Sequence, residues 1–291
     1  MVTLEGKAVV VTGAGRGLGR AYAEAIAASG GSVVVNDVDG AEAHEVAAAI
    51  TAGGGRAVAH RADVSHPQEA DGLVERCVAE FGAIDGLVNN AGYGMVDASA
   101  PEDQDPDELR RVLEVNVVGT ALCGIAALRH MRPRGSGSIV NDTSVAMAGT
   151  KRLGAYSASK GAAASLTLSW AADLEGSGVR VNGISPMAVT RSWNWELLPD
   201  PGALGDQGRL RPQDNAGLVV FLLSDAAAAV TGQLVALRAG NLNVVSHQSA
   251  LEPTLFSEDW SADRVGAAFA ADLAGLLQPP GLRRARVEYL E

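Results

Sequence analysis

The sequence predicts an α/β fold with a doubly wound sheet of about seven parallel strands and helices on both faces. Short apolar runs alternate with longer helical patterns along most of the chain, an order that is typical of parallel sheets. The strand-like runs are apolar throughout rather than alternating, as expected for strands that are covered on both faces. No internal repeat or low-complexity linker interrupts this order, so we expect a single domain.

Seven short apolar runs are the expected strands: residues 8–11, 33–35, 56–60, 84–88, 138–141, 179–184 and 233–237. Six helical patterns separate or follow them: residues 20–29, 41–52, 67–81, 106–132, 156–175 and 212–223. One helix start is well marked, because Asp105 can cap it, Pro106 suits its first position and Glu108 lies three residues after the cap. The acidic run around these residues, 101–108, is most simply a solvated loop and helix start.

The chain divides into a sheet domain over residues 1–245 and a C-terminal helical extension over residues 246–291. Four apolar residues of the extension recur at helical spacing: Val265, Phe269, Leu273 and Leu276. Ser261 can cap this helix. Since such a helix must bury its apolar stripe, we expect it to pack over residues 190–211 or on a neighbouring subunit. A free, solvated tail is the alternative.

Composition and charge are those of an ordinary globular protein of 291 residues, 47% apolar and 20% charged. A net charge of −11 argues against nucleic acid or an anionic membrane as the main partner. Cys77 and Cys123 lie in helical patterns and are expected to be buried thiols. The five histidines show no metal-ligand spacing, so we expect no metal site. No secretory signal pattern and no apolar run of ~18 residues is present, so we expect a cytoplasmic protein.

Residues 12–19 form a glycine-rich turn, TGAGRGLG, between the first expected strand and the first expected helix. Gly13 permits a sharp turn, Gly17 lets the backbone approach a phosphate closely, and Gly19 lets the helix pack near the strand. The free N–H groups and the positive end of the helix dipole then face the anion. The turn therefore predicts a site for the pyrophosphate of a dinucleotide, with Arg16 and Leu18 beside it.

Asp37 ends the second expected strand, roughly 20 residues after the glycine turn. A carboxylate there accepts hydrogen bonds from the adenosine ribose and repels a 2′-phosphate, so it favours NAD over NADP. Arg16 favours the opposite, because a guanidinium in the turn attracts a 2′-phosphate. Asp37 carries more weight because it is expected at the 2′ position itself; alternatively, it is a solvated turn residue or a helix cap. Asp63, after the third strand, suits the adenine amino group and equally a helix cap.

Tyr156 and Lys160 are four residues apart at the start of a helical pattern, which puts both on one helix face. An ammonium group near a phenol favours the phenolate, so this tyrosine can exchange a proton with a carbinol oxygen. Ser144 follows the fifth expected strand and can hydrogen-bond the same oxygen, for which Thr143 is the less suitable hydroxyl. Alone, this spacing is common on protein surfaces, and the motifs around it give it meaning.

Several motifs occur in the order seen in one family: TGAGRGLG at residues 12–19, Asn-Asn-Ala-Gly at residues 89–92, Asn116, the set of Ser144, Tyr156 and Lys160, and Thr190. Together they make residues 6–240 resemble the short-chain dehydrogenase/reductase family, whose fold is of the Rossmann type. The resemblance implies that Tyr156 is the general acid and base and that Lys160 holds the nicotinamide ribose. It implies that Ser144 orients the substrate oxygen and that Asn116 anchors a water of the proton path.

The resemblance also implies a set of residues that contact the nicotinamide cofactor: Gly13, Arg16, Gly17, Leu18, Gly19, Asp37, Asp63, Val64, Asn89, Ala91, Gly92, Tyr156, Lys160, Pro186 and Thr190. The family commonly has Pro-Gly where this chain has Pro186-Met187, so we expect Met187 to reshape the pocket beside the nicotinamide. Residues 190–211 correspond to the family's substrate lid. Its Trp193 and Trp195 either contact an apolar substrate or pack the lid on the body. The expected substrate contacts are Ser144, Met187, Trp193 and Trp195.

The leading interpretation is an NAD(H)-dependent oxidoreductase that interconverts a secondary alcohol and a ketone on an apolar small molecule. Residues 19–23 and 35–37 are locally similar to (3R)-hydroxyacyl-CoA dehydrogenases, but such residues mostly contact the cofactor. A hydroxyacyl thioester, a steroid, a terpenoid and a polyketide all stay open as substrates. The alternatives are a catalytically silent nucleotide-binding regulator, and a relative that runs an epimerisation or dehydration. An intact set of Ser144, Tyr156 and Lys160 argues against the regulator.

Helical segments 106–132 and 156–175 carry many small residues, among them Gly119, Gly124 and Gly161. In the family these helices pair across a two-fold axis, and small residues allow helices to approach closely. We therefore expect a homodimer or homotetramer. Alternatively, the small residues face the sheet.

Overall fold

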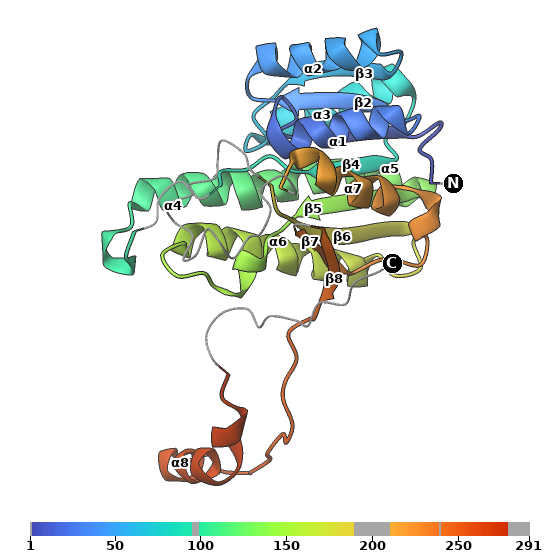
Figure 1. The fold of residues 1–291 in the computed structure, drawn as a ribbon. Coiled ribbons are helices and arrows are strands. Elements are labelled where there is room, and N and C mark those ends of the chain that lie inside the picture. Colours follow the sequence, from blue (N-terminus) through green and yellow to red (C-terminus); the bar gives the residue numbers. More distant parts are fainter. Residues whose placement is uncertain (1, 95–98, 189–209, 239, 279–291) are drawn as a thin grey trace.

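The computed structural model describes residues 2–94, 99–188, 210–238 and 240–278. Its centre is one eight-stranded sheet with the strand order β3-β2-β1-β4-β5-β6-β7-β8 (Figure 1). Neighbouring strands are parallel except for the β7–β8 pair, which is antiparallel. The strands are β1 (Ala8–Val11), β2 (Ser32–Asp37), β3 (Arg56–Arg61), β4 (Gly86–Asn89), β5 (Gly137–Asp142), β6 (Val179–Pro186), β7 (Leu234–Arg238) and β8 (Asn241–Val245).

The helices alternate with the parallel strands. They are α1 (Gly17–Ala28), α2 (Gly40–Ala52), α3 (Pro67–Phe81), α4 (Pro106–Leu113), α5 (Thr120–Arg134), α6 (Gly154–Asp173), α7 (Ala216–Leu223) and α8 (Ala262–Ala268). A π-helical segment, Glu114–Gly119, joins α4 to α5 without a break. Short 3₁₀ turns lie at Pro101–Asp103, Val145–Ala148, Pro212–Asn215 and Asp225–Ala227.

Helices cover both faces of the sheet, because alternate residues of each central strand point to opposite sides. On one face, α1, α2 and α7 pack in a core cluster that includes Val9, Val35 and Val140. On the other face, α3, α5 and α6 pack in a second cluster that includes Val10 and Ile139. This doubly covered, mostly parallel sheet confirms the predicted fold class.

The strand order reverses between β1 and β4. From β1 the chain proceeds outward through β2 to β3, and it then crosses to β4 and proceeds outward through β5, β6 and β7. A crevice forms at such a reversal, outside the carboxyl ends of the strands, and ligands of open α/β sheets bind there. The glycine turn follows β1, so it lies at this point of the sheet.

The eighth strand, β8, is one that the sequence analysis does not predict. It pairs antiparallel with β7, with Leu242 opposite Leu237 and Val244 opposite Val235. β8 is an exposed edge strand, in which Leu242 and Val244 are both 64% exposed. Its sequence therefore does not need the continuous apolar run of strands that are buried on both faces, and it has none. The expectation of about seven strands therefore accounts for the parallel part of the sheet and misses its antiparallel edge.

The extension beyond β8 leads to α8, which lies away from the sheet domain (Figure 1). Ser261 caps this helix, since its Oγ accepts a hydrogen bond from the N–H of Arg264. Val265 and Phe269 stay 38% and 45% exposed. The helix therefore starts where the sequence pattern places it. The burial of its apolar stripe stays a prediction, because the described residues of this one chain do not cover it.

The long helix Pro106–Arg134 is the one helix among the described residues that is long and apolar enough to cross a membrane. In the fold, 44% of its most apolar stretch is buried, and Cys123 and Met131 lie in the core. It is therefore a core helix of the sheet domain. Cys77 and Cys123 are buried free thiols, as expected, and burial raises the pKa of each thiol to about 12.

Candidate active site

The glycine turn connects the end of β1 to α1 at the strand reversal. Gly13 has a φ of +61°, and a Cβ on it would lie 2.7 Å from the Cα of Ala91. A side chain is therefore excluded both by the backbone conformation and by the close approach of the segment after β4. Gly15, which the sequence analysis does not single out, is constrained by contacts alone, because a Cβ there would lie 2.8 Å from Cβ of Glu42 and 2.9 Å from Oδ2 of Asp37.

Asn90 holds this turn in place and is a residue that sequence reasoning named only as part of a motif. Its Nδ2 donates to the carbonyl oxygens of Thr12 and Gly13, both at 2.9 Å. In return, the hydroxyl of Thr12 accepts hydrogen bonds from the N–H groups of Asn90 and Ala91 at 3.0 Å. The end of β4 therefore fixes the shape of the turn. The only sequence signal was the second asparagine of the pair at the end of β4.

The carboxylate of Asp37 lies against the glycine turn. Its Oδ2 accepts a hydrogen bond from the N–H of Gly15 at 3.0 Å, and the residue is buried. It does not cap α2, because Asp39 accepts the hydrogen bonds at that helix start. Arg16 extends to α2 instead, where its Nη1 lies 3.0 Å from Oε1 of Glu42. The structure thus brings Asp37 to the turn and holds the Arg16 guanidinium with a second carboxylate.

Asp63 and Val64 follow β3 at the same edge of the sheet. The Asp63 carboxylate accepts hydrogen bonds from the hydroxyl and the N–H of Ser65, at 2.7 and 3.0 Å. These bonds lower the pKa of the Asp63 carboxyl. Asp63 therefore shapes the turn before α3, although His66 and not Asp63 is the residue at the helix cap. Val64 is buried, and its side chain lies close to Gly119.

Asn116 lies in the π-helical segment and links three elements. Its Oδ1 accepts from the N–H of Tyr93 at 2.8 Å, and its Nδ2 donates to the carbonyl of Tyr93 and to Oγ of Ser159, both at 3.0 Å. Ser159 in turn donates to the carbonyl of Tyr156 at 2.8 Å. Short π-helical segments are frequent at functional sites. Here the segment brings Asn116 to the first turn of α6.

Tyr156 and Lys160 stand one turn apart at the start of α6. The Nζ of Lys160 lies 5.6 Å from the centroid of the Tyr156 ring, so the structure places the two groups together as the spacing predicts. Nζ also donates to the carbonyl oxygen of Asp142 at 2.8 Å. Burial lowers the pKa of Lys160, but the nearby Asp142 and Tyr156 outweigh it, so the net shift is upward and the ammonium stays charged.

Ser144 follows β5 and begins the short helical turn Val145–Ala148. Its Oγ accepts a hydrogen bond from the N–H of Ala146 at 3.1 Å. The neighbouring Thr143 is buried, and its hydroxyl donates to the carbonyl of Ile184 in β6 at 2.7 Å. Thr143 therefore ties β5 to β6, and the choice of Ser144 as the hydroxyl that meets the substrate stays a prediction.

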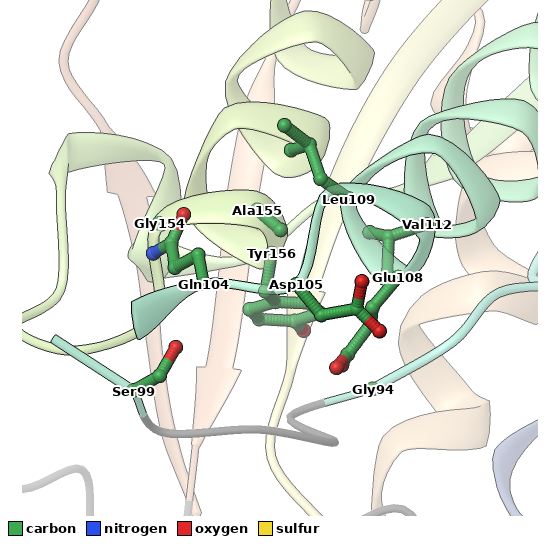
Figure 2. Close-up of a pocket in the computed structure, with 10 residues that line it drawn as sticks. All are labelled: Gly94, Ser99, Gln104, Asp105, Glu108, Leu109, Val112, Gly154, Ala155 and Tyr156. Atoms are coloured by element: carbon green, nitrogen blue, oxygen red, sulfur yellow. The ribbon is translucent and has the colours of Figure 1, made fainter. Parts of the chain in front are cut away.

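A small cavity of about 20 Å³ lies beside Tyr156 (Figure 2). Its wall is of mixed polarity, with Leu109 and Val112 from α4 beside Gln104, Asp105 and Glu108. Asp105 caps α4 as expected. The interpretation of the acidic run as a merely solvated loop and helix start is incomplete, since Asp105 and Glu108 line this cavity.

The remaining predicted cofactor and substrate residues lie at the same end of the sheet or outside the described residues. Asn89 is turned into the layer between β4, β5 and α5, where its Nδ2 donates to Oδ1 of Asn141 at 2.9 Å. Met187 is buried after Pro186, and Asn215 holds its backbone by two hydrogen bonds. Asn215 has no signal in the sequence analysis. The predicted residues outside the described part are Thr190, Trp193 and Trp195.

No group of three His, Cys, Asp or Glu side chains in the described ranges is arranged to hold a metal ion.

Residues 7–201 match the family model described as short chain dehydrogenase. This range is more than half of the chain, and the protein belongs to the short-chain dehydrogenase/reductase family. It is therefore an oxidoreductase of a family that binds a nicotinamide cofactor.

Several relatives are similar over most of the chain. The cis-4-hydroxycyclohexanecarboxylate dehydrogenase of Sinomonas cyclohexanicum is 40% identical over 242 residues, which are 80% of this chain and 96% of that protein. A short chain dehydrogenase from Mycobacterium avium has a TM-score of 0.81 at 33% identity, over 96% of this chain and 98% of that one. A 7α-hydroxysteroid dehydrogenase, solved with NADH and 7-oxo glycochenodeoxycholic acid, has a TM-score of 0.73 at 34% identity, over 82% of this chain and 95% of that one.

Proposed function

We propose that the protein oxidises a secondary alcohol to a ketone with NAD, or runs the reverse reduction with NADH. The placement of Tyr156 and Lys160 carries this proposal. Tyr156 lines the cavity (Figure 2), and the buried ammonium of Lys160 lies 5.6 Å from the centroid of its ring. A phenol that meets both a pocket and an ammonium is suited to exchange a proton with a substrate oxygen. Binding of a nucleotide alone does not need a phenol at this place.

Each residue of the site has a role in this reaction. Tyr156 is the general acid in reduction and the general base in oxidation, and Lys160 holds the nicotinamide ribose and favours the phenolate. Ser144 orients the substrate oxygen. Asn116, which already holds the first turn of α6 through Ser159, anchors a water of the proton path. A bound nicotinamide supplies the hydride transfer, and the side chains supply position and charge.

The carboxylates around the glycine turn support NAD rather than NADP. Asp37 is bonded to Gly15 within the turn, where the adenosine ribose is expected. Arg16 is the cation that could offset the charge of a 2′-phosphate, but its guanidinium is paired with Glu42. A 2′-phosphate in this place would therefore meet two carboxylates and one partly neutralised cation.

The cavity of about 20 Å³ has room for about one water, so it marks only the reacting end of the proposed substrate site, and its wall supports a substrate with no anionic group near the reacting carbon. Leu109 and Val112 offer apolar contacts, whereas the carboxylates of Asp105 and Glu108 repel an anion. Met187, Trp193 and Trp195 complete the proposed substrate contacts, the two tryptophans from the part of the chain outside the described residues. Neutral alcohols, which include steroids and terpenoids among the open classes, fit this wall better than carboxylates do.

The direct test is a screen of secondary alcohols and ketones by NADH absorbance, with NADP in parallel. The panel pairs neutral alcohols with their carboxylate counterparts. We expect NADH formation with neutral members, no turnover in Tyr156→Phe, and normal turnover in Asp173→Asn, a control at the exposed far end of α6. A protein that binds NADH but turns over no member contradicts the proposal and favours the regulator. Net release of NADH with product excludes the epimerisation and dehydration alternatives.

A further inference from the structure

Asp142, the last residue of β5, contacts Lys160 through both its backbone and its side chain. Its carbonyl oxygen accepts a hydrogen bond from Nζ of Lys160 at 2.8 Å, and its Oδ1 lies 3.7 Å from the same nitrogen. The two side chains are only 11% and 9% exposed. An ion pair in such a place is screened weakly by water and salt, so its charge acts on every group nearby.

The surroundings of the Asp142 carboxylate are otherwise poor in charge. Asp142 is two residues after Val140, so its side chain is on the face of the sheet that α1 covers. The titratable groups that interact with it are Lys160 from α6 and Tyr22 from α1, and Tyr156 lies beyond Lys160. Tyr22 is fully buried, and its hydroxyl finds no hydrogen-bond partner among the described residues. A carboxylate is costly in such a setting unless it is paired.

Burial raises the pKa of the Asp142 carboxyl to about 6, although the neighbouring Lys160 ammonium opposes this shift. The carboxyl is therefore ionised above that pH, where an alcohol is expected to be oxidised, and it faces the Lys160 ammonium as a charged partner. The same ammonium lies 5.6 Å from the centroid of the Tyr156 ring, so Lys160 connects this carboxylate to the phenol. The lysine favours the phenolate, and the carboxylate partly cancels that effect.

We propose that Asp142 is a positioning residue of the active site, which holds the Lys160 ammonium beside Tyr156 and sets the pH at which Tyr156 becomes a base. The carbonyl and the carboxylate fix the direction of the lysine side chain. The negative charge moves formation of the Tyr156 phenolate to higher pH than Lys160 alone would allow. This role rests on the proposed function, because it assigns the proton exchange to Tyr156.

The test is the Asp142→Asn variant, which keeps the size of the side chain and the carbonyl that binds Lys160 but removes the charge. Formation of the Tyr156 phenolate is followed by ultraviolet difference absorbance, with Tyr156→Phe in the same background subtracted. We expect the midpoint of phenolate formation to fall by about one pH unit in Asp142→Asn. This shift corresponds to the loss of a repulsion of roughly 1–2 kcal/mol between the Asp142 carboxylate and the Tyr156 phenolate. Asp173→Asn, which removes a charge from the far end of α6, should leave the midpoint in place.

An unchanged midpoint in Asp142→Asn overturns the proposal. Asp142→Ser, which also lacks the charge and cannot overfill the site, answers the same question if the asparagine variant does not fold. The pH profile of kcat for alcohol oxidation is measured in parallel and should shift by the same amount. Because the absorbance readout needs no turnover, a shifted midpoint in a protein without activity would support the role of Asp142 while contradicting the proposed function.

Discussion

Arg16 of the glycine turn is paired with Glu42 of α2, with 3.0 Å between Nη1 and Oε1. Because of this pair, the guanidinium of Arg16, the one cation in residues 12–19, is already bound to a carboxylate where a phosphate would need it. Asp37, on the other side, accepts a hydrogen bond from the turn itself. We therefore expect the choice between NAD and NADP to depend on two carboxylates that act in the same direction, Asp37 directly and Glu42 through Arg16.

The first prediction is that NAD binds at least tenfold more tightly than NADP. A carboxylate close to a 2′-phosphate costs roughly 2 kcal/mol or more, which is more than a tenfold loss in affinity. Fluorescence titration of both reduced cofactors measures the ratio. Asp37→Ser should bring the affinities for the two cofactors closer together. Glu42→Gln should do so to a smaller extent, because it frees Arg16 from its carboxylate partner. Equal binding of the two cofactors by the unaltered protein would show that Arg16 dominates.

The second prediction is that Tyr156→Phe lowers turnover about 10²–10⁴-fold, the usual loss for a general acid–base group. The ring stays in place, so the affinity for NADH should change little. Lys160→Ala is the contrasting variant. It should weaken both NADH binding and turnover and move the pH optimum upward, because the phenolate loses its cation. Activity that survives in Tyr156→Phe would remove Tyr156 from the mechanism.

Apolar runs and helical periodicity in the sequence were sufficient to predict the parallel strands and the helices between them. The strands β1, β2, β5 and β6 are largely buried against helices, and each leaves a run or alternation of Val and Ile in the sequence. β8 leaves no such run because it is an exposed edge strand with Leu242 and Val244 facing out. The pattern of an edge strand is close to that of a loop, so periodicity alone did not distinguish them.

The site was predictable where function depends on spacing within one element, as for Tyr156 and Lys160 on α6. It was not predictable where a role arises from contacts between elements that are distant in sequence. Asn90 acts on the turn around Thr12, and Asp142 acts on Lys160 in the next helix. Glu108 comes to the cavity only because α4 packs beside α6. Such roles need the tertiary arrangement, which no local pattern encodes.

The third prediction concerns stability and pH. The pKa of the Asp142 carboxyl is raised from 3.8 to about 6 by burial, so the folded state binds this proton more tightly than the unfolded chain does. Stability from this group is therefore full below about pH 4 and is lost as pH rises toward 6. An asparagine has no carboxyl group to ionise, so Asp142→Asn does not lose this stability as the pH rises. The free energy of unfolding of the variant, relative to that of the unaltered protein, should therefore be about 1 kcal/mol higher at pH 8 than at pH 5.

Urea unfolding at the two pH values, followed by circular dichroism, measures this difference. Asp173→Asn serves as the control for removal of an exposed carboxylate. A variant that is less stable than the unaltered protein at pH 8 would mean that the Asp142–Lys160 pair contributes more than burial of the carboxylate costs.

The fourth prediction concerns assembly. Ala126 and Ala127 of α5 are buried in the core cluster that packs on the sheet, which matches the alternative that small residues face the sheet, whereas Gly124 lies against Trp170 of α6. Val118 and Ile125, one on the π-helical segment and one on α5, remain 39% and 43% exposed on the outer side. We expect this outer side to pair with a second copy of the chain. Light scattering at micromolar concentration should give a dimer or tetramer, and Ile125→Glu should give smaller particles with unchanged circular dichroism. A monomer in the unaltered protein contradicts this prediction.

The last prediction concerns the extension. Apolar side chains that are at least 38% exposed recur along it: Leu251, Phe256, Trp260, Val265, Phe269 and Leu277. Phe256 alone is 89% exposed, and such a density of exposed apolar side chains is unusual for a solvated tail. The match with the Mycobacterium avium structure covers 96% of this chain and therefore reaches into the extension. We expect the extension to pack on a neighbouring subunit or over residues 190–211.

Deleting the residues after Ser249 should then lower the melting temperature and change either the oligomeric state or the Michaelis constant for the substrate. Phe269→Ser in the full chain is the finer variant, since it removes one side chain of the stripe and leaves the cap at Ser261 intact. Burial of one phenylalanine at an interface contributes roughly 1.5–3 kcal/mol, so its loss should be visible in the dissociation of the assembly on dilution. A change in the Michaelis constant without a change in assembly would place the extension over residues 190–211, and a truncated protein that keeps all three properties would show that the extension packs on neither.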